Sequence, residues 1–336
     1  MRQFNTTKML AVTASLLFLA ACGTDNTPQV NTAPLSVSVA ETATVQPTAE
    51  TGYLTVTHLS GVTEVPINPQ RVMVFDMGLL DTLYYFGLAD RIIGLPLDFV
   101  PNHLVHHFNA NNGFVNIGTM HDPNFEELIL HEVDLILHSG RTRPHYDELS
   151  LIAPTLDLGL VNGDMLNSFT ENNRYLGQIF NIEEAMAHNL SDIHAAVAAI
   201  AADASALELE ALIVMYSEGG LRAFGPRGRF GLIHDYFGFA TVDETIDTAN
   251  HGVVVTNEYL LSVDPDILFV IVRDYTISEE IPYEDIENEI VQLTQAWQND
   301  NLNYLNPEIW YIGNGGVRGM WEQIDEMRAA IVRAQS

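Results

Sequence analysis

The chain has 336 residues, 47% of them hydrophobic, so it is long enough to form two lobes with a core in each. Its formal net charge is -30, from 44 acidic and 14 basic side chains. Because nucleic acids and anionic membranes attract proteins through Lys and Arg, this charge argues against both as electrostatic partners.

The N-terminal segment has the pattern of a secretory signal. Two basic residues precede an apolar run from Met9 to Leu19, which is short for a membrane span and is followed by small residues. The sequence Leu19-Ala20-Ala21-Cys22-Gly23 resembles a bacterial lipobox, in which the cysteine is lipidated and becomes the new N-terminus. We therefore expect residues 1–21 to be a signal peptide and Cys22, the sole cysteine, to carry a lipid anchor. A buried free thiol is the alternative for this residue.

Residues 22–52 are predicted to form a flexible linker. They are rich in Thr, Ala, Pro and Val and sustain neither a helical nor a strand period. Such a linker would let the folded part reach above the membrane. The expected location is therefore extracytoplasmic, with the protein lipid-anchored in the periplasm or on the outer face of the cell membrane.

The first lobe, residues 53–181, opens with a β pattern at Tyr53–Leu59. A buried strand follows at Arg71–Phe75, then a helix at Met77–Gly87 and a further strand at Arg91–Leu95. This alternation of strand, helix and strand is typical of an α/β lobe with a mainly parallel sheet.

The two halves of the chain repeat one pattern, in which a helix precedes a buried strand and an arginine follows the strand. Ligands of open α/β sheets collect beyond the carboxyl ends of the strands, so the two arginines are predicted to face one crevice and to bind an anion. The pattern comprises Asn124–His131, Val133–His138 and Arg141 in the first half, and Asn257–Leu261, Asp266–Val272 and Arg273 in the second.

One long helix is predicted between the halves. Residues 182–204 are rich in Ala and amphipathic and contain no Gly or Pro, so we expect a rigid helix that joins the first lobe to a second α/β lobe at 205–336. A helix packed wholly within one lobe is the alternative that periodicity alone leaves open.

Further candidate ligand residues lie in the second half. Ala223–Gly231 is rich in Gly and contains Arg229, and its glycines would let the backbone and the arginine approach a ligand closely. It lacks the Lys-Ser/Thr ending of a P-loop. His251 lies in a polar loop and Tyr311 follows a tryptophan. Taken alone, such a histidine is usually solvated and such a tyrosine is usually a core residue, so neither position by itself indicates a ligand.

From about Tyr53 to the C-terminus, the chain resembles the cluster A, or class III, periplasmic siderophore-binding proteins of ABC importers, specifically the catecholate branch that takes up enterobactin-type and petrobactin ligands. The resemblance depends on the order and spacing of several short motifs. These are Phe75-Asp76-Met77-Gly78-Leu79-Leu80-Asp81-Thr82, Ser139-Gly140-Arg141, Ile152-Ala153-Pro154-Thr155, Phe224-Gly225-Pro226, Arg229-Phe230-Gly231, His234-Asp235 and Trp310-Tyr311.

The resemblance implies a role for several of these residues. Arg141, Arg229 and Arg273 match the three family arginines that bind the anionic iron-catecholate centre. His251 and Tyr311 match residues that coordinate iron directly in some members, when the siderophore is only tetradentate. Iron(III) would then be bound as a siderophore complex, and no intrinsic cofactor is expected.

The resemblance also implies a transport partner. We expect a monomer that delivers its ligand to an ABC transporter permease, which relatives contact through a surface carboxylate on each lobe. Glu126 or Glu127 is the candidate on the first lobe. An ordinary solvated glutamate is the alternative at either position.

The competing function is a binding protein for bare zinc or manganese. It is suggested by seven histidines in the first lobe, two of which have the i, i+4 spacing that places imidazoles on one helix face. However, a metal cage gives no role to three inward arginines. No motif pairs an activated nucleophile with a base, so we expect no enzyme activity. The seven are His103, His106, His107, His121, His131, His138 and His145.

Overall fold

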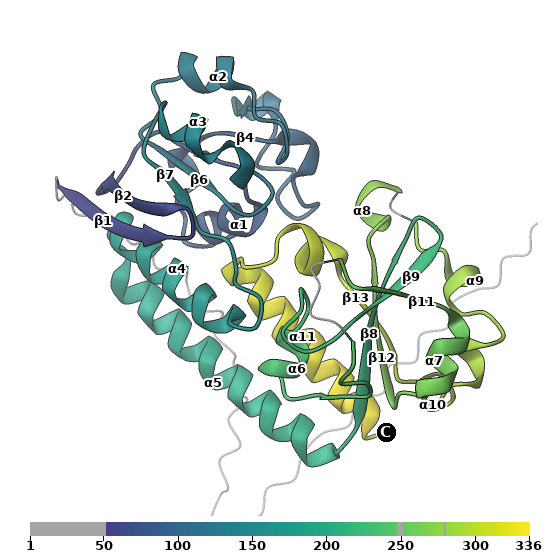
Figure 1. Ribbon diagram of the computed structural model, residues 1–336. Helices are drawn as coiled ribbons and strands as arrows, with labels where there is room; N and C mark the ends of the chain where they lie inside the picture. The colour runs from purple at the N-terminus through teal and green to yellow at the C-terminus, as the bar shows by residue number, and fades with distance from the viewer. Residues whose placement is uncertain (1–51, 247–250, 279) are drawn as a thin grey trace, which may run out of the picture. The chain divides into compact units, whose positions relative to one another are not determined.

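The computed structural model describes residues 52–246, 251–278 and 280–336 (Figure 1). The expected signal peptide, Cys22 and nearly all of the expected linker lie outside the described residues. The signal peptide, the lipid anchor and the linker therefore stay predictions.

The first lobe is built on a five-stranded parallel sheet with the strand order β5-β4-β3-β6-β7. Its central strands are short and buried throughout, as expected for a parallel sheet covered on both faces. The strands are β3 (Val72–Val74), β4 (Ile92–Leu95), β5 (Val115–Asn116), β6 (Leu135–His138) and β7 (Thr155–Asp157). The helices are α1 (Met77–Tyr85), α2 (Phe125–Leu130) and α3 (Tyr146–Ser150).

A separate antiparallel hairpin precedes this sheet. It consists of β1 (Tyr53–His58) and β2 (Gly61–Pro66), and it packs against β7 and against α4 (Met165–Ile179). The turn of the hairpin is tied to the sheet because Ser60 Oγ donates a hydrogen bond of 2.7 Å to Asp157 Oδ2. The first residues of the described chain are therefore fixed to the end of the lobe's last strand.

A single helix, α5 (Glu183–Leu207), joins the two lobes, as the sequence predicts. Its buried residues recur every three or four positions and pack against α4 on one side and α11 (Val317–Ala334) on the other (Figure 1). By length and composition α5 is apolar enough to cross a membrane, but it has one buried stripe and is otherwise largely exposed, as is typical of an amphipathic helix on the surface of a folded protein. The helix ends where Glu208 takes a left-handed conformation, with φ of 53°.

The second lobe has a six-stranded mixed sheet with the path β11-β9-β8-β12-β13, and β10 pairs with β8. Parallel pairing joins β12 to β8 and β13, and β9 runs antiparallel to β8. The strands are β8 (Glu210–Ser217), β9 (Gly220–Phe224), β10 (Ala240–Thr241), β11 (Val253–Val255), β12 (Ile267–Val272) and β13 (Leu302–Leu305). The remaining helices are α6 (Leu232–Asp235), α7 (Asn257–Val263), α8 (Tyr275–Ser278), α9 (Tyr283–Ile286) and α10 (Gln295–Gln298).

The predicted fold class is confirmed: two α/β lobes, each with a central mainly parallel sheet, are joined by one long helix. Each predicted segment is present, and its ends differ from the prediction by at most three residues. The largest difference is at the end of α5, which ends at Leu207 and was predicted to end at residue 204. Apolar periodicity does not mark this end, because a left-handed residue and not a change of polarity stops the helix.

Candidate binding site

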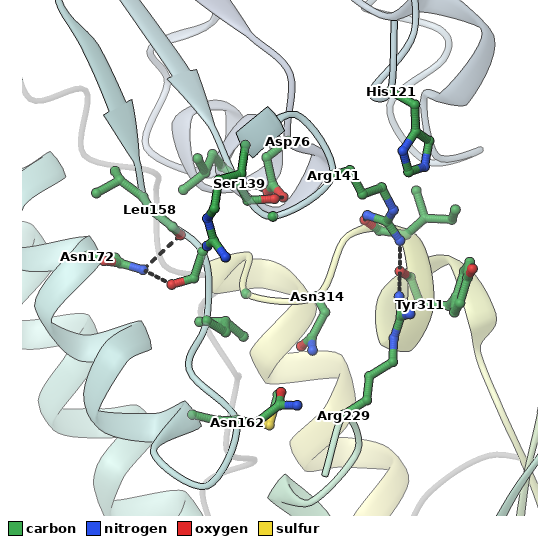
Figure 2. Close-up of a pocket in the computed structure, with 18 of the residues that line it drawn as sticks. Asp76, His121, Ser139, Arg141, Leu158, Asn162, Asn172, Arg229, Tyr311 and Asn314 are labelled. Carbon is green, nitrogen blue, oxygen red and sulfur yellow. Dashed lines mark hydrogen bonds between the residues drawn. The ribbon is translucent and has the colours of Figure 1, made fainter. Parts of the chain in front are cut away.

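A pocket of about 550 Å³ is lined by residues from both lobes (Figure 2). The first lobe contributes the residues that follow β3, β6 and β7, which are the carboxyl ends of parallel strands. The second lobe contributes the glycine-rich segment after β9 and the turn after β13. Residues that carry the argument below are Asp76, Ser139, Arg141, Arg143, Arg229 and Tyr311.

Tyr311 lies in a single π-helical turn, Glu308–Ile312, directly after β13. The preceding Trp310 is buried, and its Nε1 donates a hydrogen bond of 2.5 Å to Glu326 Oε2 on α11. Glu326 Oε1 also accepts a bond from the Asn306 amide at 2.8 Å. Glu326 therefore fixes the turn through one residue before it, Asn306, and one residue within it, Trp310. This places Tyr311 in the wall of the pocket.

The structure brings the three predicted arginines together around Tyr311. The guanidinium carbons of Arg141, Arg229 and Arg273 lie 5.4, 4.1 and 5.7 Å from the centre of the Tyr311 ring. The negative face of an aromatic ring attracts cations at these distances. One aromatic side chain thus gathers a guanidinium from the first lobe and two from the second.

The backbone carbonyl of Tyr311 accepts hydrogen bonds from both lobes. Arg141 Nη2 lies 2.6 Å from this oxygen and Arg229 Nη2 lies 3.3 Å from it, as the dashed lines in Figure 2 show. Arg141 Nη1 also lies 3.4 Å from the carbonyl of Ile312. Backbone carbonyls of the turn that carries Tyr311 therefore hold one arginine of each lobe in place.

The positive charges of Arg141, Arg229 and Arg273 repel one another. Burial, and then the like charge of Arg141, lower the pKa of Arg229 to about 10. Arg273 is placed by Ser217, whose Oγ accepts a hydrogen bond of 2.9 Å from its Nη1, and by the exposed Glu218 at 3.4 Å. Hydrogen bonds to the protein thus hold the three guanidinium groups close together despite their like charge.

Two histidines lie beside the arginines. His251, a predicted iron ligand, is exposed and lines the pocket just before β11, and its carbonyl accepts a bond of 3.4 Å from Arg222. His121 lines the pocket from the first lobe, although it was predicted only as one of the histidines of the zinc or manganese alternative. The pocket therefore has an imidazole on each lobe.

Arg143 is a pocket residue that the sequence interpretation missed. Its Nε and Nη2 lie 2.5 and 3.2 Å from the two carboxylate oxygens of Asp157, whose side chain is fully buried. Burial alone would raise the pKa of Asp157, but the hydrogen bonds from Arg143 and Ser60 outweigh it and hold the pKa below its ordinary value. Its position two residues after Arg141, in the same turn, could have predicted that Arg143 also lines the pocket.

Asp76 and Ser139 were also missed as site residues, although both belong to the motifs that carried the resemblance. Ser139 Oγ donates a hydrogen bond of 2.5 Å to Asp76 Oδ2, and both residues line the pocket. Three asparagines, Asn162, Asn172 and Asn314, line the pocket as well. This part of the pocket is polar but lacks the cluster of cations that surrounds Tyr311.

The histidines behind the metal-ion alternative are not gathered into a site. His103 pairs with Asp81 at 3.1 Å, His131 pairs with Glu127 at 3.2 Å, and His107 packs against Phe108 and other aromatic rings. Among the residues that the structure describes, no group of three or more His, Cys, Asp or Glu side chains is arranged to hold a metal ion. The described part of the chain thus gives the zinc or manganese alternative no support.

The chain is similar in sequence and in structure to known binding proteins. The petrobactin-binding protein YclQ of Bacillus subtilis is 36% identical over 267 residues, which is 79% of this chain and 84% of YclQ. Its crystal structure matches with a TM-score of 0.80, covering 83% of this chain and 99% of the solved chain.

Two further solved structures cover nearly the same part of the chain. The catecholate-siderophore binding protein VctP of Vibrio cholerae has 29% identity and a TM-score of 0.78, over 83% of this chain and all of VctP. The iron uptake ABC transporter substrate-binding protein PiuA of Streptococcus pneumoniae has 27% identity and a TM-score of 0.78, over 84% of this chain and all of PiuA. A family model described as periplasmic binding protein matches residues 79–309, and the chain therefore belongs to this family of periplasmic binding proteins.

Proposed function

We propose that the protein binds ferric catecholate siderophores in the pocket around Tyr311 and delivers them to an ABC importer for iron uptake. The observation that carries the proposal is the set of three guanidiniums, from both lobes, within 6 Å of one aromatic ring on a chain whose net charge is -30. A local concentration of positive charge on so acidic a protein fits an anionic ligand. The relatives support the proposal in two ways. YclQ is a petrobactin-binding protein and VctP a catecholate-siderophore binding protein, and PiuA is the substrate-binding protein of an iron uptake ABC transporter.

The charge of the ligand matches that of the site. Iron(III) is a hard cation that prefers oxygen donors, and three catecholates leave the complex with a charge of about -3. Three arginines compensate this charge. Their planar guanidiniums donate several hydrogen bonds to catecholate oxygens and stack on catechol rings, which lysine does not do.

His251 and Tyr311 are proposed as direct iron ligands when the siderophore supplies only four donors. A tetradentate ligand leaves two positions of six-coordinate iron open, and a neutral imidazole and a phenolate oxygen suit them. Both side chains line the pocket together with Arg141 and Arg229, whereas Arg273 does not line it and lies 5.7 Å from the centre of the Tyr311 ring. A hexadentate siderophore would need neither residue as an iron ligand.

Quenching of intrinsic fluorescence by a panel of ferric complexes tests this proposal. The panel contains a hexadentate tricatecholate, a tetradentate bis-catecholate, a hydroxamate and zinc chloride as the metal alone. We expect tight binding of the catecholates only. Binding of zinc with no binding of either catecholate would refute the function.

The same assay tests direct coordination. His251→Ala and Tyr311→Phe are expected to weaken the tetradentate complex about tenfold or more and the hexadentate complex much less. Tyr311→Phe is the sharper variant because it keeps the ring that the guanidiniums contact. Equal losses for both ligands would show that neither side chain is an iron ligand.

Lipid anchoring at Cys22 and permease docking through Glu126 or Glu127 complete the proposal. Both glutamates lie in the first turn of α2, where Glu126 is exposed and Glu127 is 3.2 Å from His131. The double variant Glu126→Gln/Glu127→Gln is expected to keep siderophore affinity and to lower uptake by cells. Unchanged uptake would remove these residues from the docking surface.

A further inference from the structure

The three guanidiniums around Tyr311 do not have the same partners. Among the described residues, no carboxylate oxygen lies within 4.0 Å of a nitrogen of Arg141 or Arg229. The oxygen atoms that accept hydrogen bonds from these two side chains are backbone carbonyls. Arg273 differs, because its Nη1 lies 3.4 Å from Glu218 Oε1. The cluster therefore contains three cations and one anion.

Glu218 lies in the tight turn between β8 and β9. The two central residues of this turn, Glu218 and Gly219, have φ of 54° and 77°. Hairpin turns with positive φ at both positions favour Asn, Asp or Gly at the first, because other side chains are strained on a left-handed backbone. The glutamate thus opposes the local preference of the turn. Such an outlier beside a binding site is a reason to look for a role in the site.

A second contact fixes this turn next to Arg273. The amide of Glu218 donates a hydrogen bond of 2.7 Å to Asp274 Oδ2. Asp274 directly follows Arg273 after β12, so one turn positions both the guanidinium and the glutamate. The Glu218 side chain is 81% exposed, and its 3.4 Å contact is longer than an ordinary charge-assisted hydrogen bond. Glu218 is therefore placed beside the guanidinium but is held to it loosely.

We propose that Glu218 is a specificity-determining residue that biases the site toward ferric chelates of lower negative charge. The inference rests on the proposed function and adds to it a selection by charge. The carboxylate competes with an anionic ligand for Arg273, and it repels each ligand in proportion to the negative charge that the ligand carries. A strongly charged chelate therefore loses more from the presence of Glu218 than a weakly charged one.

The size of the effect follows from the charges of two ligands. Iron(III) with two catecholates has a charge of about -1, and with three catecholates about -3. An exposed carboxylate changes the binding of one unit charge by about twofold. Because the repulsion energy is proportional to the ligand charge, removing Glu218 should tighten the first complex about twofold and the second about eightfold.

Glu218→Gln tests this inference because it removes the charge and keeps the length of the side chain. Quenching of intrinsic fluorescence by a ferric tetradentate bis-catecholate and a ferric hexadentate tricatecholate gives both affinities. We expect the twofold and eightfold gains at about 0.01 M salt, where charges act over about 30 Å. Both gains should nearly vanish at about 1 M salt, where that length is about 3 Å. A merely structural role would not give a gain that depends on ligand charge and on salt.

Glu208→Gln is the matched control. Glu208 is also exposed and left-handed, with φ of 53°, and it lies before β8, whereas Glu218 follows that strand. The control makes the same change in net charge far from Arg273, so both affinities should stay close to those of the wild type. Glu218→Asn is a second uncharged variant that suits a left-handed turn, and it should show the same gains as Glu218→Gln.

The outcomes distinguish the inference from the function on which it rests. If the wild-type protein binds neither ferric catecholate, the proposed function fails. If it binds them and the two Glu218 variants change both affinities equally, lower them or leave them unaltered, the function stands and the selection by charge is overturned. Gains that persist at high salt, or that Glu208→Gln also shows, overturn it as well.

Discussion

Replacing Arg229 with methionine is predicted to make the empty protein more stable while it removes ligand binding. Methionine keeps much of the apolar stem and omits the charge. Burial, and then the neighbouring charges of Arg141 and Arg273, lower the pKa of this guanidinium to about 10, well below the ordinary value of an arginine. A depressed pKa means that the folded state disfavours the charged form relative to the unfolded chain.

The size of this effect follows from the difference between the two pKa values. At about 1.4 kcal/mol for each pH unit, the charge of Arg229 costs the empty protein about 3 kcal/mol at neutral pH. The cost is fully present below pH 10 and is relieved only as pH rises towards the unfolded value. Loss of the 3.3 Å hydrogen bond to the Tyr311 carbonyl offsets about 1 kcal/mol of the gain. The expected net stabilisation is about 2 kcal/mol, or roughly 5 °C in melting temperature.

Thermal and urea unfolding of the ligand-free proteins measure this gain. Arg328→Met is the matched control, because Arg328 is an exposed arginine on α11 whose pair with Asp325 contributes little. We expect its stability to stay within about 0.5 kcal/mol of the wild type. Ferric catecholate should raise the melting temperature of the wild type and not that of Arg229→Met. If Arg229→Met is less stable than both proteins, the reasoning about uncompensated charge is wrong.

Three further predictions concern the first lobe. His138 is fully buried, and burial is the main cause of its lowered pKa, so the unfolded chain takes up a proton near pH 6.5 that the folded protein does not. The free energy of unfolding should therefore decrease as the pH is lowered from 7 to about 5.5. In His138→Gln this decrease should be smaller, and the same pH dependence in the variant and the wild type would contradict the role of His138. Asp157→Asn removes the buried carboxylate of an ion pair whose arginine is 46% exposed. It should cost about 1 to 3 kcal/mol in urea unfolding, and a loss below about 0.5 kcal/mol would contradict the role of the pair. In Gly78→Ala the new Cβ would lie 2.6 Å from the Asn314 carbonyl and should lower the melting temperature by several degrees, whereas Gly220→Ala, with no atom nearer than 3.8 Å, should change it little.

The sequence predicted the two-lobe fold because the elements that define it are marked locally. The strand β12 is a continuous apolar run, and β6 is one up to His138. Each strand is followed by an arginine that lies near the Tyr311 ring, so the sequence marks both the end of the strand and the charge beyond it. The single helix α5 is marked by its length and by the lack of Gly and Pro. Ordinary periodicity was sufficient for these features.

Other parts of the site depend on contacts that no local pattern shows. Asp157 is joined to Arg143, 14 residues away, and to Ser60, 97 residues away. The π-helical turn that carries Tyr311 depends on Glu326, a buried partner on α11. Asp76 is the N-cap of α1, and only the fold shows that the same carboxylate also lines the pocket.

The shared carbonyl of Tyr311 has a consequence for selectivity among the anions that surround a cell. Phosphate, sulfate and chloride are far more abundant there than any siderophore. The carbonyl oxygen is bonded at 2.6 Å by Arg141 and at 3.3 Å by Arg229, so it fixes one guanidinium of each lobe beside the Tyr311 ring. A small inorganic ion spans only part of a cluster spread around that ring, so we expect it to make fewer contacts than a broad, multiply charged chelate and to compete weakly for the site.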